Sequence, residues 1–326
     1  MKLKLKSTIT AMIFLLGFAV NLTAQTPTEA VDALKEGVSK SKTKDYLGAV
    51  ESFKRCVSIY EEMGEFDNEN RATAVKQIPV MQYKHALGLY KQKDYDGSIK
   101  AFEKLAEYSE TYDNEEYLKK AEGIIPQLTR IKGTALLKEK KYDEAISAYN
   151  KTLEYNPNDA KAYKYKVMAL RETDNAQALK ETATKGIEVA IAKNKSDEED
   201  DIKSLAGNYF LRKGADAYTA ENYKDAAEYF NQSLEFKEGD SDLYYQLSAV
   251  YNKLEQWDKA IEMANQSLEL FNGQGTTKDA KIYYELGNAY LGKGDNTAAC
   301  DAYSKAAKGD YQEAAEYQMK HVLKCN

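Results

Sequence analysis

The sequence predicts an all-α protein, a solenoid of about seven helical hairpins that ends in a C-terminal capping helix. Two observations predict this fold class. The chain has only four prolines in 326 residues, which favours long helices over a turn-rich β fold. Small and aromatic residues also recur at fixed intervals with a period of about 34 residues, and such a period is typical of stacked helical hairpins.

Residues 1–24 are expected to be a signal peptide that lies outside the fold. Lysines occupy positions 2, 4 and 6, and an apolar stretch follows from Ile9 to Leu22. This stretch is shorter than the roughly 20 residues that span a bilayer, so an uncleaved membrane anchor is the less favoured interpretation. Cleavage after Ala24 predicts an exported protein of the periplasm or cell envelope, and no later segment is apolar and long enough to form an integral membrane span.

The repeat is clearest near the C-terminus. Its positions there are Tyr283, Leu286, Gly287, Tyr290, Ala299 and Tyr303. Similar copies, each framed at the same repeat length, are expected near 30–63, 79–112, 126–159, 160–193, 207–240, 241–274 and 280–313, with a capping helix at 311–325. The chain after residue 24 is therefore expected to form a single solenoid.

Each copy pairs a small residue with another 12 positions later, as Gly214 does with Ala226. Two antiparallel helices cross closely where such small residues meet, because their backbones can approach. The aromatic four positions after the second small residue, here Phe230, is expected to fill the space between neighbouring hairpins. Because no hairpin can bury its apolar face alone, the hairpins are expected to stack into one continuous core.

These residue types at these intervals resemble the tetratricopeptide repeat (TPR) family, in the form of an exported bacterial member, and the resemblance covers nearly all of the chain after residue 24. It implies a right-handed α-solenoid. It also implies that the first helix of each repeat lines a concave groove.

Three insertions separate the repeats, at 64–78, 113–125 and 194–206. Each is expected to form either an extra short helix or an extension of the following first helix. Pro79 and Pro126 fall at the first position of their frames, where a helix tolerates proline. The acidic run at 196–201 predicts a loop that runs into a helix start, with a cation-binding loop as the weaker alternative, and residues 272–277 predict a flexible loop.

Tyr245 and Tyr284 are candidates for a binding surface in the groove. Each directly follows a core aromatic in the first helix of its repeat, and one step along a helix turns the side chain by about 100° onto the groove face. Asn288 is four residues beyond Tyr284 and shares that face. Exposed tyrosines beside a carboxamide suit the capture of a peptide. The alternative is that these tyrosines, like most in the chain, only pack the repeat core.

A second set of candidate groove residues is Arg130, Lys161, Lys164 and Arg171. Four cations on one face of an acidic chain suit an acidic tail or a carboxylate, and a solvated helix face is the alternative. Some TPR proteins clamp a C-terminal carboxylate with lysine and asparagine in successive repeats. Asn288 matches that asparagine, but Tyr284 stands where the lysine would be, so the resemblance does not extend to a clamp.

Composition and motifs exclude several function classes. The formal net charge of −6 excludes a basic nucleic-acid-binding surface over the whole chain. His85 and His321 are the only histidines, and neither lies in a cluster with metal-ligand spacing. No nucleophile elbow, phosphate-binding loop or metalloprotease motif occurs. The sequence therefore predicts a protein that is not an enzyme and that has no metal or cofactor.

The leading hypothesis is a non-catalytic scaffold of the cell envelope that binds a peptide or protein segment in the concave groove. The alternative is a structural subunit of an outer-membrane or secretion assembly that is bound by its outer surface. An enzyme or small-molecule binder is a third and weaker hypothesis. The repeat positions specify the scaffold and leave the partner unidentified.

Cys300 and Cys325 are predicted to form a disulfide. Cys300 begins the second helix of the last repeat and Cys325 ends the capping helix, so a short connection through Gly309 should bring the two together. Export to an oxidising compartment favours the bond, and three unpaired cysteines are the alternative. Cys56 is expected to remain a buried free thiol.

Overall fold

The structure is a computed structural model that describes residues 26–271 and 277–325. These residues form helices and their connections, and no strand occurs among them. The expected signal peptide and residues 272–276 of the expected loop lie outside the described residues. The prediction of an all-α fold built from helical hairpins is confirmed.

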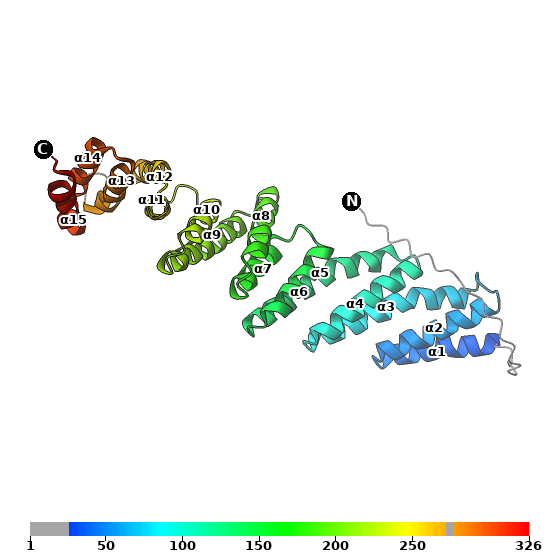
Figure 1. Cartoon of the computed structure of the whole chain (residues 1–326). Helices are drawn as coiled ribbons and strands as arrows, with labels where there is room; N and C mark the ends of the chain where they lie inside the picture. Colours follow the sequence, from blue (N-terminus) through cyan, green and yellow to red (C-terminus); the bar gives the residue numbers. More distant parts are fainter. Residues whose placement is uncertain (1–25, 272–276, 326) are drawn as a thin grey trace, which may run out of the picture. The chain divides into compact units, whose positions relative to one another are not determined.

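The helices pair as the first and second members of consecutive hairpins (Figure 1). The first helices are α1 (Pro27–Lys42), α3 (Glu69–Lys91), α5 (Glu115–Lys138), α7 (Ala160–Glu172), α9 (Ser196–Thr219), α11 (Ser241–Lys253) and α13 (Ala280–Lys293). The second helices are α2 (Tyr46–Glu62), α4 (Tyr95–Thr111), α6 (Tyr142–Tyr155), α8 (Ala176–Ala192), α10 (Tyr223–Leu234), α12 (Trp257–Leu270) and α14 (Asn296–Ala306). After these come α15 (Gln312–Tyr317) and a π-helical turn, η3 (Gln318–Leu323), while short 3₁₀ helices η1 (Thr277–Asp279) and η2 (Gly309–Tyr311) precede α13 and α15.

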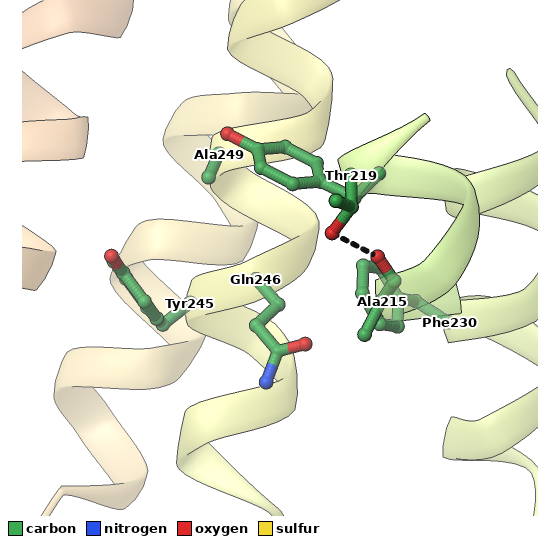
Figure 2. A pocket seen from close by; sticks show the side chains of 7 residues that line it. Ala215, Thr219, Phe230, Tyr245, Gln246 and Ala249 are labelled. Atoms are coloured by element: carbon green, nitrogen blue, oxygen red, sulfur yellow. Dashed lines mark hydrogen bonds between the residues drawn. The ribbon is translucent and has the colours of Figure 1, made fainter. Parts of the chain in front are cut away.

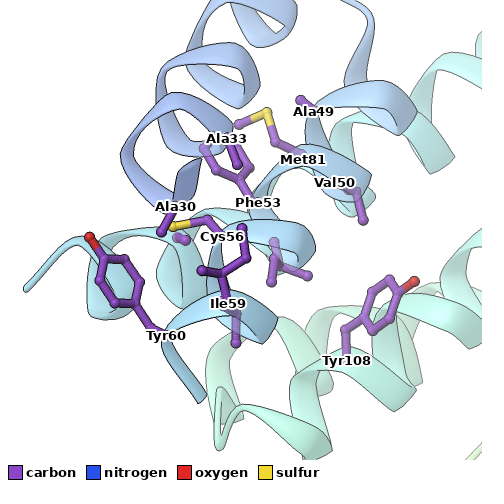
Figure 3. Close-up of a cluster of buried hydrophobic side chains, with 13 residues drawn as sticks. Ala30, Ala33, Ala49, Val50, Phe53, Cys56, Ile59, Tyr60, Met81 and Tyr108 are labelled. Carbon is purple, nitrogen blue, oxygen red and sulfur yellow. The ribbon is translucent and has the colours of Figure 1, made fainter. Parts of the chain in front are cut away.

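The chain divides into two compact units, residues 1–122 and 123–326, with the boundary inside α5. In the first unit, helices α1 to α4 all contribute to one buried cluster, which includes Ala30, Phe53, Met81 and Tyr108 (Figure 3). The second unit has several buried clusters along its hairpins. That pattern is expected when each hairpin packs mainly on its neighbours.

Helices α3, α5 and α9 have 23, 24 and 24 residues, because each insertion extends the first helix that follows it. Pro79 and Pro126 therefore lie inside α3 and α5, and of the two expected alternatives the extension of the following first helix is confirmed. A proline in a helix interior costs about 3 kcal/mol. Burial of the extended segments offsets this cost, since Ala74, Ile78 and Ala121 are fully buried.

In four hairpins a glycine of the first helix lies against an aromatic ring of the second helix. The pairs are Gly37 with Phe53, Gly133 with Tyr149, Gly214 with Phe230, and Gly287 with Tyr303. The aromatic residue thus covers the first helix of its own hairpin, a contact that adds to the expected filling of the space between hairpins. Phe230 does both, because it shares a buried cluster with Leu243 and Leu247 of the next hairpin.

Replacing Gly133 by alanine is expected to lower the free energy of unfolding by about 1 kcal/mol. A Cβ atom at Gly133 would lie 2.6 Å from Cε1 of Tyr149, a fully buried ring, so the pair must separate. Overpacking of this kind costs roughly 1–3 kcal/mol and outweighs the gain of about 1 kcal/mol that alanine brings to a helix. The matched control is Gly123→Ala in the same helix, where a Cβ meets nothing within 4 Å and a small gain is expected. Urea unfolding measures both, and equal stabilities of the two variants would contradict the prediction.

Cys56 is a fully buried free thiol, as predicted. Burial raises the pKa of this thiol to about 11, so the reactive thiolate is scarce at pH 8. We expect Ellman's reagent to modify the folded protein slowly at pH 8 and quickly after denaturation; rapid modification of the folded protein would contradict this. Between its ordinary pKa and about 11 the thiol ionises only in the unfolded state, so its contribution to stability falls as the pH rises through that window.

Candidate binding site

A hollow of about 240 Å³ lies between α9 and α11, the first helices of two consecutive hairpins in the second unit (Figure 2). Its lining comprises Ala215, Tyr218 and Thr219 of α9, Phe230 of α10, and Tyr245, Gln246 and Ala249 of α11. Ala215 and Ala249 leave the space open, because their side chains end at Cβ. Figure 2 shows Gln246 extending from α11 toward α9. The result is an apolar recess with one carboxamide beside it.

Tyr311 brings together the two tyrosines that the sequence singled out. Its hydroxyl oxygen is 3.4 Å from that of Tyr245, and its ring centroid is 5.3 Å from that of Tyr284. Burial and the hydrogen bond with Tyr311 raise the pKa of Tyr245. Tyr245 and Tyr284 are half-buried, so the expectation of exposed groove tyrosines is corrected. The physical reason is that η2, which carries Tyr311, packs against α13.

Asn288 lies in a hydrogen-bonded network beside Tyr284. Its Oδ1 accepts a hydrogen bond of 2.7 Å from the Tyr303 hydroxyl, and its Nδ2 donates to Glu285 Oε2 at 3.2 Å. Glu285 also accepts from Asn252 Nδ2 at 2.8 Å, which links α11 to α13. Both polar atoms of the Asn288 side chain therefore form hydrogen bonds inside the protein. Its carboxamide positions the Tyr303 ring, which Tyr284 contacts.

The four predicted cations do not form one open patch, because acidic residues pair with three of them. Arg130 Nε lies 3.0 Å from Asp159, Lys164 Nζ lies 3.0 Å from Asp201, and Lys161 Nζ lies 3.9 Å from Glu198. The Nε atom of Arg171 is buried and has no hydrogen-bond partner among the residues that the structure describes.

The acidic run at 196–201 supplies two of these partners. The predicted helix start is confirmed, but these residues already form the first turns of α9 and not a loop before it. Burial opposes the charge of Lys164, but the hydrogen bond and the charge of Asp201 outweigh this effect, so the pKa of Lys164 is raised. These contacts connect first helices of neighbouring hairpins and leave less free positive charge for a ligand than the sequence indicated.

Cys300 and Cys325 form a disulfide, the pairing that the sequence predicted, with their Cα atoms 5.9 Å apart. Cys300 lies in the first turns of α14 and Cys325 follows η3, so the bond ties the end of the cap to the last hairpin.

Among the described residues, no group of three or more His, Cys, Asp or Glu side chains is placed to hold a metal ion. Within the same residues, no helix combines the length and apolar character needed to cross a membrane.

Sequence reasoning missed Tyr218, Gln246 and Tyr311. Gln246 could have been found from the sequence, since it adjoins Tyr245 in a first helix. Nothing in the sequence pointed to Tyr311, because it lies in the connection between α14 and α15, beyond the small and aromatic positions that mark the repeat.

Helical hairpins that repeat along the chain and pack on their neighbours define the class of helical-repeat proteins. Family models, each described as tetratricopeptide repeat, match residues 81–110, 132–179 and 240–312. The chain is a TPR protein.

The chain is similar to heat shock protein STI1 of Saccharomyces cerevisiae, with 32% identity over 113 residues, which are 34% of this chain and 18% of that protein. Among solved structures it is similar to the MamA protein, with 20% identity, a TM-score of 0.34, and coverage of 60% of this chain and 95% of the other. It is also similar to YrrB, described as a TPR protein with an unusual peptide-binding site, with 19% identity, a TM-score of 0.32, and coverage of 60% and 88%.

Proposed function

We propose that this protein is a non-catalytic interaction scaffold that holds a peptide or protein segment in its groove, against α9 and α11. The observation that carries the proposal is the recess between these helices. At about 240 Å³ it is smaller than the roughly 300–1,000 Å³ of small-molecule sites, so it suits one large side chain of a longer partner.

The lining has the chemistry that peptide recognition needs. The rings of Tyr218 and Tyr245 offer contact area and have few rotatable bonds, so little conformational entropy is lost when a partner binds. The carboxamide of Gln246 can donate to a peptide carbonyl and accept from a peptide N–H. The segment is therefore expected to be extended and to present an aliphatic or aromatic side chain to the recess.

Site-specific photo-cross-linking tests the proposal in the native host. A photoreactive amino acid replaces Thr219, which is exposed beside the recess, or Asn265, which is exposed on the second helix α12. A partner that is captured from position 219 and not from 265 supports groove binding, and Ala215→Trp, which fills the recess, should abolish that product. Capture from position 265 alone would contradict groove binding and favour a structural subunit that is bound by its outer surface.

Ala215 is the better position to change than Tyr245 or Tyr284. The tyrosines pack against Tyr311, so their loss would also disturb the last hairpin. Ala215 is exposed, and its substitution leaves those contacts in place.

Export to the periplasm or cell envelope is the proposed location. The lysine-led apolar segment supports it, and so does the Cys300–Cys325 disulfide, because such bonds persist in oxidising compartments. Intact-mass analysis of protein from the native host should show a chain that lacks residues 1–24. A mass that includes Met1 to Ala24 would contradict the proposal.

A further inference from the structure

We infer that the C-terminal cap is an autoinhibitory strap that covers part of the binding face and that the Cys300–Cys325 disulfide keeps it closed. The strap is defined as residues 308–325, which include η2, α15 and η3. The inference rests on the proposed function for its biological meaning, whereas its structural content can be tested without any partner.

The covered surface is the groove side of α11 and α13. Tyr245 lines the recess from α11, and Tyr284 occupies the matching repeat position in α13. Tyr311 of the strap contacts both. A partner segment that runs from the recess toward α13 would therefore compete with Tyr311 for the two tyrosines.

Two attachments hold the strap. At its start, Lys308 Nζ lies 2.6 Å from Oδ1 of Asp279, a fully buried residue at the beginning of α13. At its end, Cys325 is bonded to Cys300. Between these points the strap packs on the last hairpin through one narrow stripe, the buried Ala315 with the partly buried Met319 and Leu323. Tyr317 and Val322 are about half exposed, at 59% and 49%.

The strap is thus held by its two ends and by this narrow apolar stripe. Breaking the disulfide is expected to free it while the last hairpin stays folded. A dithiol reductant can do this by thiol–disulfide exchange: it supplies two electrons and two protons, the S–S bond becomes two thiols, and the reductant becomes a disulfide.

Hydroxyl-radical footprinting of the full processed chain tests the inference. In Cys300→Ser/Cys325→Ser, oxidation of Tyr245 and Tyr284 is expected to increase several-fold over the unaltered protein. Tyr311→Ala, which keeps the disulfide, should expose the same two residues. Two internal references are Tyr90, exposed in the first unit, and Ile282, which is buried in the last hairpin in a cluster that includes no strap residue, and both should keep their rates.

Each result decides the question. Unchanged oxidation of Tyr245 and Tyr284 in both variants would overturn the inference. Increased oxidation of Ile282 would overturn it too, because the last hairpin would then have unfolded with the strap. Failure of the cross-linking experiment above would instead remove the proposed function and leave the strap itself intact.

Discussion

Lys308→Met is expected to lower the free energy of unfolding by about 3 kcal/mol. The substitution leaves the carboxylate of Asp279 without the cation that lies 2.6 Å away, and Asp279 has no exposed surface on which water could replace it. Breaking a buried pair from one side costs about 3–5 kcal/mol, and the low end applies because the Lys308 side chain is 28% exposed.

The matched control is Lys305→Met in the neighbouring helix α14. Lys305 pairs with Asp301 one turn away, and both side chains are more than half exposed, so a loss below about 0.5 kcal/mol is expected. Urea unfolding of the two variants at pH 7 measures the difference. Equal losses would show that the Lys308 pair contributes no more than an ordinary surface pair.

Replacing both Cys300 and Cys325 by serine is expected to cost about 3 kcal/mol in the chain-entropy model, because the two bonded residues are 25 positions apart. The effect should be local, since hairpins in a repeat array share stability mainly with their neighbours. Hydrogen exchange should therefore accelerate most in α14, α15 and η3, less in α11 and α12, and not at all in α1 to α4.

Reduction of the unaltered protein provides the control for this pair of substitutions. It should reproduce the exchange pattern of the double variant, because both break the same bond and leave the rest of the chain unchanged. Uniform acceleration across the first and second units would contradict the local effect, and no acceleration in α14 would show that the bond adds no stability.

The hairpins and the disulfide could be predicted because they depend on residues close in sequence. Gly133 and Tyr149, for example, lie on two helices joined by a single turn, and a glycine and an aromatic residue at this spacing predict that the two are in contact. Cys300 and Cys325 flank one short connection, so antiparallel packing of its two sides was enough to pair them.

The covered tyrosines and the paired cations could not be predicted in the same way. Their partners come from other repeats or from outside the repeat pattern: Lys164 pairs with Asp201 of the next first helix, and Tyr245 meets Tyr311 of the strap. The choice between an extra helix and an extension before Pro79 stayed open for a related reason, since the burial that keeps α3 continuous through Pro79 involves the preceding hairpin. Repeat spacing describes each hairpin and says little about what its outer residues contact.

The contact between Tyr245 and Tyr311 also has a consequence for the order of folding. The two residues are 66 positions apart, whereas Gly133 and Tyr149 are joined within one hairpin. Contacts between residues distant in sequence form late, because the intervening chain must be ordered first. The strap is therefore expected to close after the last two hairpins have stacked, so that a newly made chain passes through a stage in which Tyr245 is open to a partner.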